Sequence, residues 1–373
     1  MPHYLWQQDN WTNFRWDSAR ILAPLSDCRL HQGKLLSTVS SLGFHLENQA
    51  EILAEETVTT AAIEGDQLDA RMVRSSVARR LGLPSAGLVA DHSVDGLITV
   101  LLDATRNHHA PLTAERLCGW QAALFPTGYS GMHRIRVGEW RGNVPMHVVS
   151  GPIGRETIHF EAPPSSRVPD EMTTFLKWWA ASHNTVEGVL RAAVAHFRFV
   201  TIHPFEDGNG RLARAITDTA LAQDDGQAVR YYSLSAQIMA ERDNYYDILE
   251  RCQKGDGDLT EWLLWFLSCF KRAIGRADSL LNMVRDKAAF WQRYADAALS
   301  ERQKKVINRL LEAGKGGFEG GLTNRKYAAL TKVSRATAFR ELESLRDMGI
   351  ICQVGSGRNV RYDLSWVMTG KED

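Results

Sequence analysis

A run of twelve residues near the middle of the chain combines an imidazole, a carboxylate, a glycine-rich segment and two guanidinium groups. The run reads His203-Pro204-Phe205-Glu206-Asp207-Gly208-Asn209-Gly210-Arg211-Leu212-Ala213-Arg214. The residue before a proline is pushed towards extended geometry, so we expect His203 at a helix end, facing outward. Gly208, Asn209 and Gly210 accept positive φ without strain, which predicts a tight turn.

The two arginines indicate an anion-binding site. Arg211 and Arg214 fall in the first turn of the next helix, where the macrodipole is already positive. Backbone N–H groups of a glycine turn and a helix N-terminus cradle phosphates, and guanidinium groups suit phosphate oxygens. We therefore expect a polyphosphate on this turn. Asp207 would hold Mg²⁺, which binds through one or two carboxylates plus substrate phosphates, and His203 remains as the proton acceptor.

Apolar spacing predicts the two helices that position this turn. The residues before it follow a helical stripe up to His203, and those after it resume helical spacing, with Gly226 as the stop. The stripe residues are Val186, Leu190, Ala193, Val194, Phe197 and Val200 before the turn, and Leu212, Ala215, Ile216, Thr219 and Ala220 after it. Taken singly, a histidine, a glycine turn and surface arginines each have an ordinary structural explanation. Their combination favours a site.

The stretch resembles the Fic family motif, His-Pro-Phe-x-Asp/Glu-Gly-Asn-Gly/Lys-Arg-x-x-Arg, and every fixed position is filled. Short motifs carry a risk of chance matches, which falls as more positions are fixed. The resemblance implies a helical Fic core and transfer of AMP from ATP to a hydroxyl side chain (Ser, Thr or Tyr) of a target protein or of the chain itself. It makes His203 the catalytic residue.

A second motif lies far upstream. Thr60 and Glu64 are spaced i, i+4, on one face of a helix predicted over residues 40–63, and Gly65 ends it. The segment resembles the family's inhibitory motif, Ser/Thr-x-x-x-Glu-Gly/Asn. The resemblance implies that Glu64 pairs with Arg214, displaces the γ-phosphate of ATP and inhibits the enzyme intramolecularly.

Two further segments resemble parts of Fic domains. Extended runs on either side of a Gly-Pro turn predict a β-hairpin, and the resemblance implies a flap that holds a target segment by β-augmentation. Its target-binding residues would be Val148, Val149, Ser150 and Gly151. Adjacent tyrosines on a helix are ordinarily packed in a core, but the resemblance places them in the adenosine pocket with a polar residue seven positions on. These nucleotide-binding residues would be Tyr245, Tyr246 and Gln253.

Composition excludes several classes of protein. The 373 residues are 44% hydrophobic, enough for real cores, and 44 basic residues balance 44 acidic ones. Five scattered cysteines without a Cys-x-x-Cys pair suit reduced thiols. With neither a signal-peptide pattern at the start nor an apolar run approaching about eighteen residues, we expect a soluble, cytoplasmic protein that does not bind membranes.

We expect a mainly α fold in three parts. Residues 1–85 would form an N-terminal arm and the inhibitory helix, residues 86–285 the Fic catalytic domain, and residues 300–373 a winged helix-turn-helix domain. In the arm, Trp6, Trp11 and Trp16 follow neither a helix nor a strand period. We expect these tryptophans to pack on the body of the protein. The arm is similar to a small domain of unknown function found ahead of some Fic domains.

The C-terminal part is predicted as helices over 304–311, 322–330 and 334–348, followed by a hairpin, which resembles a winged helix-turn-helix. From Glu301 onward 14 basic residues face 9 acidic ones. If this part binds DNA, Arg335, Thr337 and Arg340 would face a major groove, and Arg358 and Arg361 the backbone. A dimerisation or target-docking module is the alternative, so the sequence leaves a homodimer open.

Two other functions fit the same residues. One is a DNA-binding regulator whose Fic-like site senses a nucleotide; an intact His203 and Asp207 argue against it, because sensing needs no base. The other is a related reaction, such as AMP removal or transfer of another phosphate-linked group, which the motif does not distinguish from AMP transfer.

Overall fold

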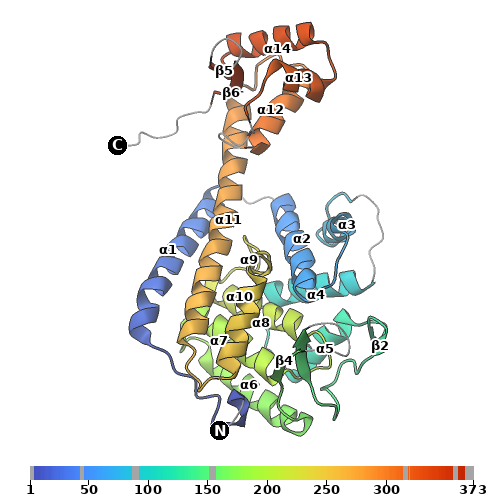
Figure 1. Ribbon diagram of the computed structural model, residues 1–373, viewed down its shortest axis with the longest axis vertical. Coiled ribbons are helices and arrows are strands. Elements are labelled where there is room, and N and C mark those ends of the chain that lie inside the picture. Colours follow the sequence, from blue (N-terminus) through green and yellow to red (C-terminus); the bar gives the residue numbers. More distant parts are fainter. Residues whose placement is uncertain are drawn as a thin grey trace. The chain divides into compact units, whose positions relative to one another are not determined.

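The computed structural model describes residues 4–42, 46–85, 92–150, 157–313, 318, 320–355 and 360–365. These residues fold mainly as α-helices with a few short strands, as predicted (Figure 1). The chain divides into two compact units, residues 1–277 and 278–373. The predicted division at residues 85, 285 and 300 stays a prediction. Among the described residues, no helix has both the length and the apolar character that a membrane span needs.

The first unit is built around two helices, α7 (Gly188–Ile202) and α8 (Asn209–Asp225), which pack against each other and carry the motif at their junction. Every residue of α7 from Val189 to Ile202 is buried, which is typical of a central helix. Gly226 ends α8 in the left-handed conformation, as predicted. Figure 1 places α1 and the start of α11 on one side of this pair, with α2, α4 and α5 on the other.

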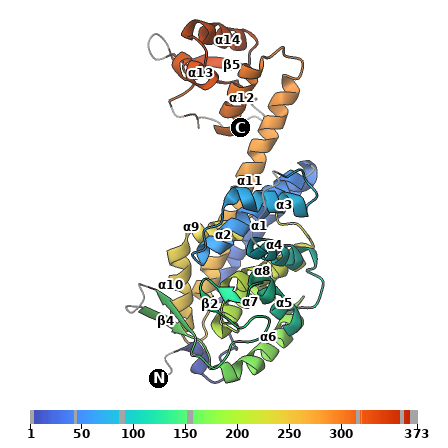
Figure 2. The ribbon, with the colours of Figure 1, turned by 90° about the vertical axis from the view of Figure 1, so that its right-hand side faces the viewer.

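The surrounding helices cover this pair from all sides, and Figure 2 shows the same arrangement from the side. Their bounds are α1 Ser18–Leu42, α2 Leu46–Ile63, α3 Ala70–Arg80, α4 His92–Arg106, α5 Ala114–Leu124, α6 Val168–Ser182, α9 Leu234–Ala240, α10 Arg242–Gln253 and α11 Thr260–Arg293, with short 3-10 turns at Leu5–Gln7 and Ser165–Arg167. The predicted helix that carries the adjacent tyrosines is confirmed as α10.

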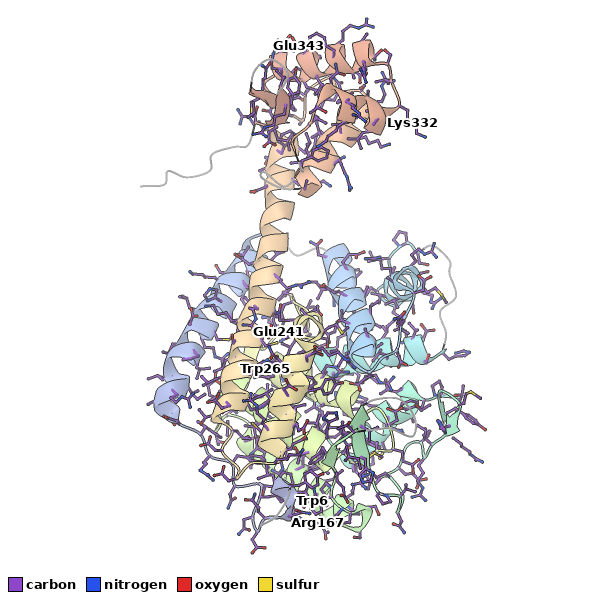
Figure 3. The ribbon with its side chains drawn as sticks, viewed as in Figure 1. Trp6, Arg167, Glu241, Trp265, Lys332 and Glu343 are labelled. Atoms are coloured by element: carbon purple, nitrogen blue, oxygen red, sulfur yellow. The ribbon has the colours of Figure 1, made fainter. Side chains whose placement is uncertain are left out.

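The N-terminal segment packs on the body of the first unit, as expected. The indole of Trp6 donates to the carbonyl of Glu161 at 2.7 Å, and its ring lies 5.5 Å from the guanidinium of Arg167 (Figure 3). The Trp11 indole donates to Glu171 at 3.1 Å. Residues 18–42, which follow these tryptophans, form helix α1.

The inhibitory helix is shorter than predicted. We expected one helix over residues 40–63, whereas α1 ends at Leu42 and α2 begins at Leu46. The apolar spacing continued across both helices and concealed the break. Helix α2 packs on α3, α4, α8 and α9, so the segment that carries Thr60 and Glu64 lies against the motif helix α8.

Among the described residues, short antiparallel hairpins complete the fold. Strands β1 (Tyr129–Ser130) and β2 (His133–Arg134) precede the predicted flap, which is β3 (His147–Ser150) paired with β4 (Thr157–Glu161). The flap register pairs Val148 with Phe160 and Val149 with Ile158, with an irregularity between the two valines.

The second unit has a core of its own. Its helices, α12 (Glu301–Ala313), α13 (Asn324–Thr331) and α14 (Arg335–Asp347), lie close to the predicted ranges, and β5 (Ile351–Val354) pairs with β6 (Arg361–Leu364). Leu310, Tyr327 and Leu342 are among the buried residues between these elements. The winged-helix assignment stays a prediction, and Arg358 lies outside the described residues.

Candidate functional site

His203 occupies the end of α7 in a conformation that the sequence did not predict. We expected extended geometry before Pro204, but His203 has φ 52° and ψ 59°, in the left-handed region. Hydrogen bonds on both sides hold this conformation: the His203 N–H donates to Phe199 at 3.0 Å, and its carbonyl accepts from the Arg141 guanidinium at 2.7 Å. These bonds offset the strain of a left-handed residue.

The same contacts define the protonation of the imidazole. Nδ1 lies 3.1 Å from the Val200 carbonyl, which can only accept, so Nδ1 carries the hydrogen and Nε2 keeps its lone pair. Burial lowers the pKa of His203, the bond to Val200 opposes that shift, and the nearby Arg141 charge lowers it further. His203 is therefore a neutral base near pH 7, with Nε2 available to take a proton.

The glycine turn forms only in part as predicted: Gly208 has φ 88°, but Asn209 and Gly210 are already the first residues of α8. Asn209 is 2% exposed, and its amide bonds both backbone groups of Phe205, at 3.0 Å and 2.8 Å. The Asn209 side chain therefore braces the turn; its direct contact with phosphates stays a prediction.

Both motif arginines are buried and keep unused donors at the turn. Arg211 lies 3.4 Å from Asp66 and 3.5 Å from Asp207, and its guanidinium stacks 4.9 Å from the Phe125 ring centroid. Within the described part of the chain, the buried Arg211 Nε and Arg214 Nη1 have no hydrogen-bond partner. A buried unpaired N–H is costly and calls for an absent acceptor, which an anion would supply.

Arg214 connects the motif to α2. Its Nε donates to the Thr60 hydroxyl at 2.6 Å, and its Nη2 donates to the Thr60 carbonyl and to Glu64 Oε1, both at 2.8 Å. The predicted pair of Arg214 and Glu64 is joined by a single hydrogen bond, while Thr60 engages Nε and shares Nη2, and Nη1 has no partner among the described residues. Gly65 follows at φ 97°, where it ends the helix.

Gly210 makes the approach of Glu64 sterically feasible. A Cβ at this position would lie 2.1 Å from Glu64 Oε1 and 3.3 Å from Arg214 Nη1. Glu64 thus lies directly over the turn that is predicted to bind phosphates.

Asp207 lines an open cleft of about 460 Å³ together with Glu64, Asp66 and Arg211. It also accepts a hydrogen bond from Ser130 of β1. No group of three or more metal-binding side chains occurs among the described residues. The Asp207 carboxylate suits Mg²⁺ brought with a nucleotide, because this ion binds through one or two carboxylates together with phosphate oxygens.

Sequence reasoning missed two residues that hold the turn. Arg141 is 4% exposed and bonds the carbonyls of His203 and Pro163. Glu206, the variable position of the motif, accepts the N–H of Arg136 at 2.9 Å and that of Gly142 at 3.3 Å. No local pattern marks either residue, since their partners lie far away in the sequence.

The predicted adenosine-pocket residues are largely inside the protein. Tyr245 is 2% exposed and its hydroxyl lies 2.9 Å from His196 Nε2, while Gln253 donates to Thr201 at 3.3 Å. Tyr246 is half-buried and donates to the carbonyl of Ile63, which also accepts from Arg242 at 2.9 Å. Tyr246 therefore contacts the end of the inhibitory helix. The nucleotide-binding role of these three residues stays a prediction.

The predicted flap is exposed on its outer side. Val149 is 48% exposed and Ile158 is 50% exposed, while Phe160 is buried against Tyr4 with ring centroids 5.3 Å apart. The hairpin is two-stranded, so an extended segment could pair with an edge. Of the predicted target-binding residues, Val148 and Ser150 lie on β3, and Gly151 falls outside the described residues.

Comparisons with known proteins bear on both halves of the first unit. Residues 111–221 match the model of the Fic/DOC family, and residues 4–83 match a domain of unknown function, DUF4172. Protein adenylyltransferase Fic of Drosophila melanogaster is 35% identical over 86 residues, 23% of this chain and 16% of the relative. A probable protein adenylyltransferase of Aquifex aeolicus (strain VF5) is 30% identical over 105 residues, 28% of this chain and 32% of the relative.

The chain thus spans less than a third of the length of either relative. A solved structure supports the fold over nearly the whole chain. A Fic family protein from Desulfovibrio desulfuricans G20 superimposes with a TM-score of 0.56 at 18% identity, covering 94% of this chain and 97% of that one. The chain thus carries a Fic domain over residues 111–221, and the complete motif lies within it.

Proposed function

We propose that the protein is an adenylyltransferase that moves AMP from ATP to a hydroxyl side chain of a protein, either a target or the chain itself. One observation carries the proposal: next to a neutral His203, the buried Arg211 and Arg214 have N–H donors without partners at a glycine turn. A triphosphate supplies acceptors for those donors. The names of the relatives agree with this reaction.

The proposed roles follow from the contacts. The target hydroxyl attacks the α-phosphorus of ATP, its proton passes to Nε2 of His203, and pyrophosphate leaves. The turn amides and the two arginines stabilise the charge on the departing phosphates, which is more effective in a buried site than in water. Asp207 would hold Mg²⁺, which neutralises phosphate charge when bound.

We propose further that Glu64 inhibits this reaction. Glu64 bonds Arg214 and lies 2.1 Å from where a Cβ of Gly210 would stand, so its carboxylate takes space and a donor that a terminal phosphate needs. The carboxylate would also repel a phosphate placed next to it, because both carry negative charge. ATP would then bind in a position unsuited to in-line attack.

The test is incubation of the purified chain with ATP labelled on the α-phosphate, with and without a mixture of cell proteins. We expect label on protein, increased by Glu64→Gly and abolished by His203→Ala. Label carried by the γ-phosphate instead would indicate another group transfer, and loss of previously attached AMP would indicate the reverse reaction. Absence of any transfer by the Glu64→Gly variant would overturn the proposal.

A second candidate function concerns the C-terminal unit, which we propose binds DNA. Ser334 caps α14, its hydroxyl accepting the Thr337 N–H at 3.1 Å, and Arg335 and Arg340 are exposed on that helix. Phe339, 51% exposed beside them, could contact a base methyl group. Binding to a target protein or to a second copy of the chain is the alternative outcome.

A further inference from the structure

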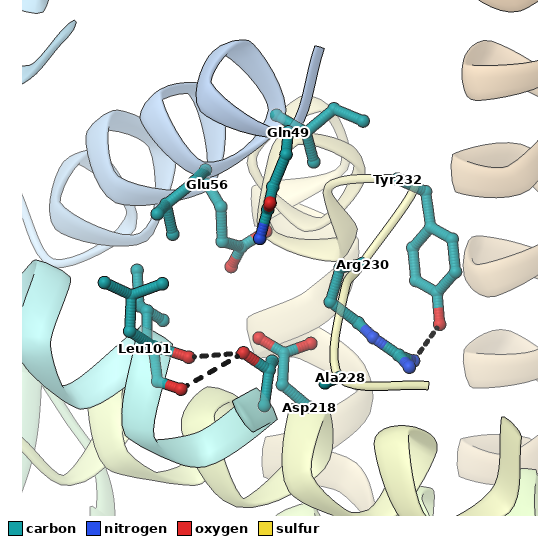
Figure 4. A pocket seen from close by; sticks show the side chains of 11 residues that line it. Gln49, Glu56, Leu101, Asp218, Ala228, Arg230 and Tyr232 are labelled. Atoms are coloured by element: carbon teal, nitrogen blue, oxygen red, sulfur yellow. Dashed lines mark hydrogen bonds between the residues drawn. The ribbon is translucent and has the colours of Figure 1, made fainter. Parts of the chain in front are cut away.

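A second pair of acidic residues joins the inhibitory helix to the motif helix, one turn away from the Glu64–Arg214 contact. Glu56 lies on α2, four residues before Thr60, and Asp218 lies on α8, four residues after Arg214. Residues four apart share a helix face. Figure 4 shows the two carboxyl groups on opposite sides of a small cavity of about 30 Å³. Glu56 and Asp218 are called the carboxyl pair below.

The two members of the carboxyl pair differ in their hydrogen bonds. Glu56, 7% exposed, accepts from the Ser233 hydroxyl at 2.7 Å, from the Ser235 N–H at 3.1 Å and from the Ser235 hydroxyl. Asp218 is 5% exposed and has no hydrogen bond among the described residues, so its pKa is set by burial and by nearby charges. Burial raises the pKa of both carboxyl groups, but the donors on Glu56 oppose that shift and Asp218 has none, so Glu56 holds the charge and Asp218 holds the proton.

Two arginines near the pair have other partners, although Arg214 Nη1 and Arg230 Nε are unpaired among the described residues. Arg214 bonds Thr60 and Glu64, and Arg230 bonds Asp225 and the Tyr232 hydroxyl, both at 2.9 Å. Helix α4 contributes only Leu101, Leu102 and Thr105 to the cavity, and α2 adds the uncharged Gln49. Ser233, which caps α9, and Ser235, within it, are uncharged. No other cation among the cavity-lining residues described here is positioned to neutralise Asp218.

We propose that docking of the inhibitory helix α2 onto α8 depends on a proton that Asp218 holds, opposite the ionised Glu56. This inference rests on the proposed function, because it concerns how strongly Glu64 is held over the site. When α2 is docked, Asp218 is protonated and tolerates the neighbouring Glu56. When Asp218 ionises, two buried like charges face each other across the α2–α8 contact, and the docked state is weakened.

The direction of the pH effect follows from proton linkage. Burial raises the pKa of Asp218 well above its usual range, the Glu56 charge adds to this, and Arg230 and Arg214 oppose it. Undocking of α2 opens the cavity to water and removes Glu56, so the pKa of Asp218 returns to about 4. The docked state therefore binds more protons. Docking is strongest below that ordinary value and weakens as pH rises towards the raised pKa, by up to about tenfold per pH unit.

Hydrogen exchange of the α2 amides, in the full chain without nucleotide, measures docking independently of catalysis. We expect protection factors over residues 46–63, corrected for intrinsic rates, to fall as the pH rises from about 4 towards the raised pKa of Asp218, by up to about tenfold per unit. Asp218→Asn, which cannot ionise, should abolish this fall. Glu51→Gln is the matched control, because Glu51 lies on the same helix but pairs at the surface with Arg74, and it should retain the fall.

A wild-type protection factor that does not change with pH, or a fall that persists in Asp218→Asn, would overturn the inference. If Asp218→Asn does not fold, Glu56→Gln provides the test. It removes the neighbouring charge, so the fall should shift towards lower pH, and an unshifted fall would contradict the role of the pair.

An activity measurement separates this inference from the proposed function. The rate of automodification by the wild type, divided by that of Glu64→Gly, cancels the pH dependence of the chemistry and should rise with pH. The same ratio in the Asp218→Asn background should be flat. If no variant transfers AMP while the exchange follows the expectation, the proposed function fails and the inference stands. If Glu64→Gly transfers AMP but the wild-type ratio does not change with pH, the proposed function stands and the inference fails.

Discussion

Replacement of Glu64 by glycine is the most direct perturbation of this site. Glu64 contributes one hydrogen bond to Arg214, at 2.8 Å, whereas Thr60 contributes two. The variant therefore removes the carboxylate and leaves the guanidinium held by Thr60. We expect the rate of AMP transfer to rise, because Arg214 Nη2 becomes available to a phosphate without a change in its position.

The structure limits the size of this gain. Arg214 is 2% exposed but the Glu64 side chain is 28% exposed, so their bond is a partly buried, charge-assisted hydrogen bond, for which about 1.5–3 kcal/mol is an upper range. At about 1.4 kcal/mol per factor of ten, that corresponds to a rate gain of roughly 10- to 150-fold. Without the Glu64 carboxylate, the buried positive charge of Arg214 lacks a neighbouring negative charge when ATP is absent. ATP should therefore raise the melting temperature of the variant more than that of the wild type.

The assay compares initial rates of automodification with α-labelled ATP at equal protein concentration. Glu64→Gln is a useful intermediate, because its amide oxygen still accepts from Arg214 but carries no charge, and it should give a smaller gain than glycine. Glu51→Gln, a surface change on the same helix, should leave the rate unchanged. Circular dichroism of each variant shows that α2 and the core remain folded.

Equal rates for the wild type and Glu64→Gly, with both proteins folded, would refute the reasoning. Glu64 would then be an ordinary helix-end residue, and the contact with Arg214 would have no regulatory consequence. A gain in Glu64→Gln as large as that in glycine would show that charge, not the volume over Gly210, causes inhibition.

Further expectations concern the base, the residue that braces it and the C-terminal unit. His203→Ala should lower transfer by about 10²- to 10⁴-fold while ATP binding, measured calorimetrically, is retained; full activity would exclude the assignment. Because burial lowers the pKa of His203, the base stays neutral to more acidic pH, so the rate of Glu64→Gly should begin to fall only below about pH 6.5. An inflection above neutral pH would contradict this. Arg141→Ala should destabilise the fold by about 3 kcal/mol in urea unfolding, since two buried carbonyls lose their charged donor, whereas a change within error would mean that the turn needs no brace. If the C-terminal unit binds DNA, affinity should fall steeply with salt, and Arg361→Ala should reduce the slope by about one; salt-independent binding would favour a protein partner.

Local patterns were sufficient for the motif helices and for the C-terminal elements. Helix periodicity, Gly208 and Gly226 are signals read within a few residues, and α7, α8 and α14 lie where such signals placed them. The same kind of signal failed at residues 18–46. Helix α1 has little apolar periodicity to reveal it, and its boundary with α2 interrupts a stripe that looked continuous.

The sequence by itself determined the chemistry of the site, because His203, Asp207, the glycine turn and the arginines are contiguous and constrained by local hydrogen bonding. Tertiary structure alone decided the conformation of His203, since Arg141 holds its carbonyl from 62 residues away. It also decided that Arg214 divides its donors between Thr60 and Glu64, and that Glu56 faces Asp218 across a cavity. Such contacts depend on how α2 packs on α8. The spacing of residues along the chain does not predict which charged groups this packing buries.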